Sequence, residues 1–239
     1  MTPWRRLVVS SIESGYRFEV AMSQTESLDE FLESQSLKIH RSDRKLAKMV
    51  REAYPIGVPA LIMKSSTDRL GESAGYEFHL GTPDELLRRL ASWLLTGAGA
   101  DQRALLRLVG RLWGRHGRED VAMAALLLAN LDHVSLGSDP WKVLASSIRD
   151  TEPAEALLLS IEELLRAGRE PPSDEVVIRW CHGRPVDGHL AILVAHAGLL
   201  KGNVPSQSVF DALYTVEIPA EDSLLGRIMQ RWGETRAQD

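Results

Sequence analysis

The stretch RALLRLVGRLWGRHGRED, from Arg103 to Asp120, decides the fold class of this chain. Its leucine, valine and tryptophan residues recur at intervals of three and four, which places them on one face of an α-helix. Arginines stand at positions 103, 107, 111 and 115, each turned by about 40° from the one before, so the four cover one side of the helix. This stripe is either a phosphate-binding surface or the solvated face of an amphipathic helix, which is the commoner outcome.

The same apolar spacing continues along most of the chain and is interrupted by short Gly, Pro, Ser or Asp segments. It predicts an all-α protein, with helices near 41–53, 58–70, 83–97, 102–115, 118–132, 140–149, 153–167, 174–182, 187–201, 206–215 and 221–234. The first helices of successive pairs begin roughly 30–40 residues apart, which is the length of a two-helix repeat. We therefore predict a solenoid of paired antiparallel helices, with an irregular bundle as the alternative. Residues 1–239 form one domain, in which residues 1–40 are a less regular N-terminal cap.

Several helix starts are readable from the sequence. GTPDELL predicts Thr82 as an N-cap with Pro83 in the first helical position, because a threonine oxygen can accept a free backbone N–H. GSDPW predicts Asp139 as the next such cap, and DTEPAEALL predicts Thr151 or Glu152. The TGAGADQ segment is expected to end a helix and link it to the next.

Composition limits the cellular setting. The apolar run from Leu7 to Val9 is too short for a secretory signal, which takes about 7–15 apolar residues, and no run reaches the roughly 20 of a membrane helix. The single cysteine, Cys181, excludes an intramolecular disulfide and fits a reducing compartment. We expect a cytoplasmic protein without a membrane partner. The net charge of −5 means that any nucleic-acid binding needs a local basic surface.

Two parts of the chain resemble the AlkD-type alkylpurine DNA glycosylases, a family of HEAT-like helical repeats. The first is YPIGVPALIMKSSTDRLG (54–71) with LLRLVGRLWGRHGREDVAMAALLLANL (105–131), which carry a Gly-Val element before a helix and then Leu112, Trp113 and Glu119 before an alanine- and leucine-rich helix. The second is VIRWCHGRPVDGHLAILVAHAGLL (177–200), which is similar to a later repeat. The resemblance implies a HEAT-like α-α superhelix.

The resemblance also implies a chemistry. Members of the family hold duplex DNA on a concave basic face and hydrolyse the N-glycosidic bond of cationic alkylated purines, with an aspartate beside tryptophans and an arginine on a following repeat. The corresponding segment here, SSIRDTEPAEALLLS (146–160), has no tryptophan and no aspartate after Asp150. Its nearest carboxylates, Glu155 and Glu152, are therefore the candidate catalytic residues, because either could stabilise positive charge developing on the sugar. His189 lies about where the arginine is expected.

Basic and aromatic residues near helix ends are the candidate DNA contacts. They are Arg115, Arg118, Arg149, Arg184, His189 and Trp180. Aligned repeats would bring the cations into a row, as phosphate binding requires, while Trp141 or Trp180 would offer an aromatic wall to a cationic base. Taken singly, each arginine is more often a surface charge. The densest basic run is HRSDRKLAKMVRE (40–52), for which phosphate binding and a solvated helix face both stay open.

Other kinds of site are not indicated. The histidines at 182, 189 and 196 are seven residues apart, hence about 10 Å along a helix, too far apart for ligands of one zinc ion. The chain has no Gly-x-Ser-x-Gly elbow and no GxxxxGK[ST] phosphate loop. We expect neither a metal nor a cofactor. The leading hypothesis is a protein that binds double-stranded DNA and excises alkylated purines, and the alternative is a non-catalytic solenoid that binds a protein partner.

Overall fold

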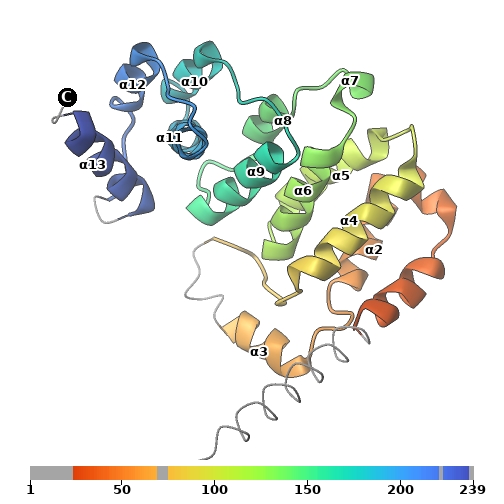
Figure 1. Ribbon diagram of the computed structural model, residues 1–239. Helices are drawn as coiled ribbons and strands as arrows, with labels where there is room; N and C mark the ends of the chain where they lie inside the picture. Colours follow the sequence, from red (N-terminus) through yellow and green to blue (C-terminus); the bar gives the residue numbers. More distant parts are fainter. Residues whose placement is uncertain (1–23, 69–74, 221–222, 237–239) are drawn as a thin grey trace, which may run out of the picture.

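A computed structural model describes residues 24–68, 75–220 and 223–236, and every regular element in these ranges is a helix (Figure 1). Residues 24–33 form the first described helix. The others are η1 (Leu37–Arg41), α2 (Asp43–Ala53), α3 (Ala60–Asp68), α4 (Asp84–Ala98), α5 (Arg103–Arg115), α6 (Arg118–Asn130), α7 (His133–Leu136), α8 (Pro140–Ser147), α9 (Ala154–Arg166), α10 (Asp174–Cys181), α11 (Pro185–Leu200), α12 (Gln207–Leu213) and α13 (Leu224–Arg236). The all-α prediction is confirmed.

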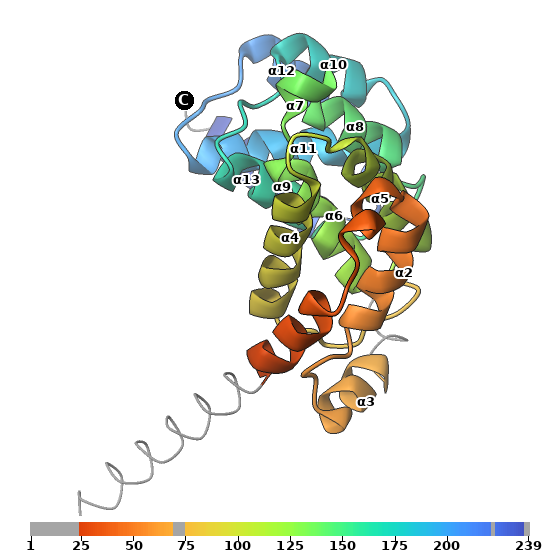
Figure 2. The same cartoon turned by 90° about the vertical axis from the view of Figure 1, so that its right-hand side faces the viewer.

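The helices lie in two rows, seen from two sides in Figures 1 and 2. In one row α4 packs against α6, α6 against α9, α9 against α11, and α11 against α13. In the other, α2 packs against α5, α5 against α8, and α10 against α12. The contacts of α5 with α6 and of α10 with α11 join the rows.

The difference between α5 and α6 shows why the rows form. On α5 the leucine, valine and tryptophan side chains are buried, whereas the arginines of the stripe lie on the other side. On α6 every residue from Glu119 to Ala129 is buried, because α4, α5 and α9 surround it. A helix that is apolar all round needs such cover on each side, so the sequence of α6 requires neighbours on several faces. This buried helix is the centre of the core.

The helix starts confirm one predicted cap and correct two. The Asp139 side chain accepts the Trp141 and Lys142 N–H groups, with a proline in the first helical turn, as predicted. The N-cap of α4 is Pro83, while the Thr82 hydroxyl donates to the Tyr54 carbonyl at 2.9 Å. Pro153 is likewise the N-cap of α9. The Thr82 and Glu152 side chains both bind groups outside the helices that they were predicted to cap.

Three further expectations concern the chain as a whole. The helix at 24–33 and η1 lie inside the stretch predicted to be a less regular cap, whereas residues 1–23 lie outside the described residues. Gly99, with φ at 55°, ends α4 inside the TGAGADQ segment, as predicted. Within the described ranges, none of the helices combines the length and apolarity needed to cross a bilayer.

Candidate functional site

The two candidate catalytic carboxylates lie at the start of α9. The Glu152 side chain is completely buried, with its Oε2 2.6 Å from Nε2 of His116 and its Oε1 accepting the Arg149 backbone N–H at 2.7 Å. Glu155 is half exposed and forms an ion pair with Arg118 at 3.0 Å. Both carboxylates are therefore bound within the protein. We call Glu152, Glu155, His116, Arg118 and Glu119 the polar cluster.

Glu119, at the start of α6, is completely buried. Its Oε1 accepts the backbone N–H groups of Leu80 at 2.8 Å and Gly81 at 2.9 Å, and Nε2 of His79 lies 3.9 Å away. Burial lowers the pKa of His79, against the opposing effect of the Glu119 charge. Among the described residues Oε2 of Glu119 has no hydrogen-bond partner. The carboxylate thus holds the segment before α4 against the start of α6, a role that its place in the family-like motif did not reveal.

Tyr76, in the segment before α4, lies beside the polar cluster. Its ring lies 5.7 Å from the ring of His116, and its buried hydroxyl lacks a partner within the described part of the chain. Burial raises the pKa of Tyr76, and the negative charge of Glu155 adds to this effect. The hydroxyl therefore stays protonated and is an uncharged donor beside the polar cluster.

Arg115, the last arginine of the stripe, is turned inward. Its Nε donates to Asp120 at 2.8 Å, a second nitrogen also contacts that carboxylate, and Nη1 donates to the Ala47 carbonyl. Asp120 is completely buried and also accepts the Tyr54 hydroxyl at 2.9 Å. The network ties α5 and α6 to α2. The guanidinium predicted to contact DNA is in a structural position here.

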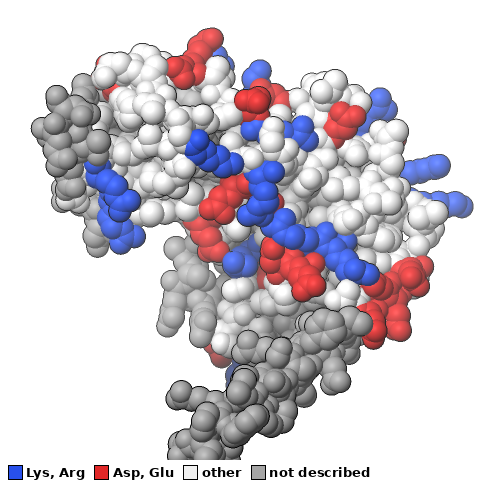
Figure 3. All heavy atoms as spheres, viewed as in Figure 1, with Lys and Arg blue, Asp and Glu red and all other residues white. Residues whose placement is uncertain are grey.

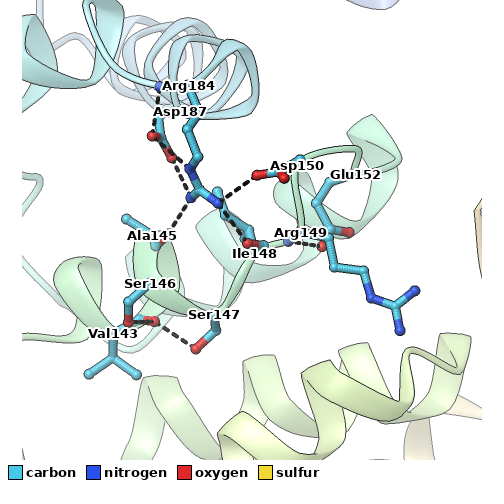
Figure 4. Close-up of polar contacts among 10 residues, drawn as sticks. All are labelled: Val143, Ala145, Ser146, Ser147, Ile148, Arg149, Asp150, Glu152, Arg184 and Asp187. Carbon is cyan, nitrogen blue, oxygen red and sulfur yellow. Dashed lines mark hydrogen bonds and ion pairs between the residues drawn. The ribbon is translucent and has the colours of Figure 1, made fainter.

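Arg184 and Arg149 are bound in a comparable way, and Figure 4 shows the contacts of Arg184. Arg184 pairs with Asp187 at 2.8 Å and with Asp150 at 3.2 Å. It also donates to backbone carbonyls at the end of α8, namely those of Ala145 and Ile148. Arg149 pairs with Glu77 at 3.1 Å and donates to the Gly114 carbonyl at 2.9 Å. Each of these arginines joins neighbouring elements through acceptors that lie far away in the sequence.

His189 and Trp180 differ in their position relative to the polar cluster. His189 contacts the Glu217 carbonyl at 3.2 Å and lines a pocket of about 190 Å³ together with Asp150, Glu152 and the start of α13. Only 8% of Trp180 is exposed, and it packs in the core. The structure therefore brings His189 near Glu152, whereas the indole of Trp180 is covered by other side chains. In the described ranges no set of His, Cys, Asp or Glu side chains has the geometry of a metal site.

A second region combines two features that are separate in the sequence. Helices α2 and α5 pack side by side, and the Asp43 carboxylate of α2 contacts both Arg107 and Arg111 of α5. The hydrogen bond from Arg111 lowers the pKa of Asp43. The arginine stripe thereby adjoins the basic run of residues 40–52. We call the resulting surface the basic face, and its cations are Arg41, Arg44, Lys45, Lys48, Arg51, Arg103, Arg107 and Arg111.

The cations of the basic face are exposed. Arg107 and Arg111 keep 56% and 42% of their side-chain surface accessible, and the α2 cations are exposed as well. Lys48 lies 3.7 Å from Glu52 on the same helix, and Arg51 stacks on Phe78. The face around α4 in Figure 3 differs, because its basic and acidic side chains lie next to one another. Helices α2 and α5, which carry most of these cations, lie on the side turned toward the viewer in Figure 2.

Comparison with family models, with curated proteins and with solved structures finds no match to this chain.

Proposed function

We propose that the chain is a HEAT-like helical-repeat protein that binds duplex DNA through its basic face and does not excise bases. The observation that supports this proposal is the joining of two basic helix surfaces, α2 and α5, around a single shared carboxylate, Asp43. A protein with a net charge of −5 that gathers eight cations on adjoining helices has the local electrostatic surface that phosphate binding needs.

Helix order and packing support the proposed repeat architecture. Pairs begin at positions 103, 140, 174 and 207, an interval of roughly 35 residues that suits a two-helix repeat. Helices from different pairs pack in rows, as α6 does with α9 and as α10 does with α12. These features favour the HEAT-like superhelix over an irregular bundle.

The environments of Glu152 and Glu155 support the proposal that the chain does not excise bases. Stabilising a sugar cation requires a carboxylate that faces the substrate, and an aromatic face is needed to attract a cationic base. Glu152 is sealed by His116 and by the Arg149 N–H, Glu155 is paired with Arg118, and Trp180 is in the core. We propose binding without hydrolysis for this reason.

Binding is tested by fluorescence anisotropy of a labelled duplex over a range of salt concentrations. The triple variant R44E/K45E/K48E should weaken binding at least tenfold and reduce the log–log salt slope by about 3, since each phosphate contact contributes about 0.9. The matched control K64E/K142E/R179E makes the same charge change at exposed positions on other helices and should bind nearly as the unmodified protein does. Equal losses in both variants, or no binding by the unmodified protein at low salt, would contradict the proposal.

Excision is tested by the release of methylated purines from alkylated DNA. We expect the unmodified protein and Glu155→Gln to release no more base than a reaction without protein. Release by the unmodified protein that is lost in Glu155→Gln would establish the glycosylase hypothesis instead.

A protein-binding scaffold is the second candidate. The mixed charges around α4 favour it, because alternating signs suit a protein surface better than a phosphate backbone (Figure 3). Failure of the unmodified protein to bind duplex at low salt would leave this candidate as the better explanation.

A further inference from the structure

We propose that Arg51, held on the ring of Phe78, is the anchor of the phosphate-binding surface, a more specific inference that rests on the proposed DNA-binding function. The Cζ atom of Arg51 lies 3.5 Å from the centroid of the Phe78 ring. This is the distance of a cation–π stack, in which the flat guanidinium covers the aromatic face.

The stack leaves the donors of Arg51 available. All five N–H groups of a guanidinium lie in its plane, so a ring against one face does not occupy them. Within residues 24–68, 75–220 and 223–236, no acceptor is hydrogen-bonded to this side chain, which is exposed. A phosphate can therefore approach the edge of the guanidinium and accept two parallel hydrogen bonds.

The platform under Arg51 is firmly held. The Phe78 ring fills the space beside Gly117, where an added Cβ would lie 1.9 Å from the ring. The Phe78 carbonyl accepts the Arg118 N–H at 2.8 Å, and the backbone N–H groups of Leu80 and Gly81 donate to Glu119. The polar cluster thus fixes the aromatic ring on which Arg51 rests. Through Phe78, Glu119 therefore also supports the basic face.

The other cations of α2 lack such a support among the described residues. The Arg44 and Lys45 side chains are exposed and have no partner among the described residues, so each must lose side-chain freedom when it binds. Arg51 has lost much of that freedom before binding, and a preorganised side chain gives more affinity for the same contact. Arg51 should consequently contribute more to binding than a neighbouring cation of equal charge.

The position of Arg51 also suits a polymer of phosphates. Arg44, Lys48 and Arg51 follow one another at helical spacings of four and three residues, so they lie along one side of α2. Seven residues of helix extend about 10 Å, which corresponds to about three phosphates along one DNA strand. Arg51 stands at the end of this line, beside the segment that carries Phe78.

The test measures the affinity and salt slope of the same labelled duplex with variants that keep the charge. R51K retains the positive charge but cannot stack as a plane, and F78L retains apolar bulk but removes the aromatic face. Each should weaken binding about fivefold to tenfold without changing the salt slope, since no charge is lost. The control R44K should change affinity less than twofold, and F78Y, which restores an aromatic face, should bind as the unmodified protein does.

The outcomes separate this inference from the proposed function. Absence of duplex binding by the unmodified protein would remove the proposed function and the anchor together. Salt-dependent binding in which R51K behaves as R44K does would leave DNA binding intact and overturn the anchor alone. Because Phe78 packs against Gly117, thermal unfolding of F78L is measured in parallel, and the exposed variant R51K decides the question if F78L does not fold.

Discussion

Arg111 and Arg115 are one turn apart on α5, yet they belong to different parts of the molecule. Arg111 lies on the basic face, bridges only to Asp43 among the described residues and keeps 42% of its side chain exposed. Arg115 reaches into the polar junction of α5, α6 and α2, where the buried Asp120 and the Ala47 carbonyl bind it. The comparison teaches that the acceptors supplied by the fold, rather than helical spacing, decide whether an arginine is structural or available to a ligand.

Removing the buried acceptor should have the greatest effect. Asp120→Ala leaves Arg115 and the Tyr54 hydroxyl without their shared partner, and breaking such a buried pair costs about 3–5 kcal/mol. The free energy of unfolding in urea measures this cost. The control Asp84→Ala removes an exposed i,i+4 pair with Arg88 and should cost less than about 1 kcal/mol. Similar values for the two variants would show that the junction at Arg115 is not structural.

A variant of Arg184 tests whether an arginine outside α5 also has a structural role. Arg184→Ala removes contacts with two carboxylates and two carbonyls, and should lower the free energy of unfolding by about 1–3 kcal/mol. Its affinity for duplex DNA should stay within twofold of the unmodified protein, with an unchanged salt slope. A loss of about one in the slope would show that Arg184 contacts a phosphate and is not a purely structural residue.

His40 is a titratable group that lies beside the basic face. It is buried in η1 with its ring 4.6 Å from that of Trp93, and burial lowers its pKa from the ordinary 6.5. Because the folded state disfavours the charged ring, the contribution of His40 is fully present above about pH 6.5 and is lost as the pH falls toward the lowered pKa. His40→Phe should therefore lose less stability than the unmodified protein between pH 7.5 and pH 5.5.

The pH experiment compares urea midpoints of the two proteins at each pH. Some acid sensitivity should remain in His40→Phe, because burial also lowers the pKa of His133 and His196. An unchanged pH dependence in the variant would mean that His40 makes no contribution.

Much of the helical structure could be predicted from sequence, because apolar periodicity is local. Thr82 shows where local reasoning fails, since its hydroxyl donates to Tyr54, 28 residues earlier, instead of capping α4. Glu119 shows the same limit of local reasoning at the candidate site. It could be recognised as part of a motif, but the amides that it accepts lie 38 and 39 residues earlier. In the sequence, only the charged pair Glu119-Asp120 at the start of an apolar helix indicated that polar groups are buried there.

The sequence alone determined that the chain is helical and which residues carry charge. Helix formation depends on neighbours within one or two turns, and charge depends on side-chain chemistry, so both are readable without coordinates. Tertiary structure decided which cations meet a carboxylate, because ion pairs depend on distances of a few ångströms between residues far apart in the chain. It placed α2 beside α5, so that Asp43 meets Arg111 on the basic face while the Ala47 carbonyl binds Arg115 inside the molecule.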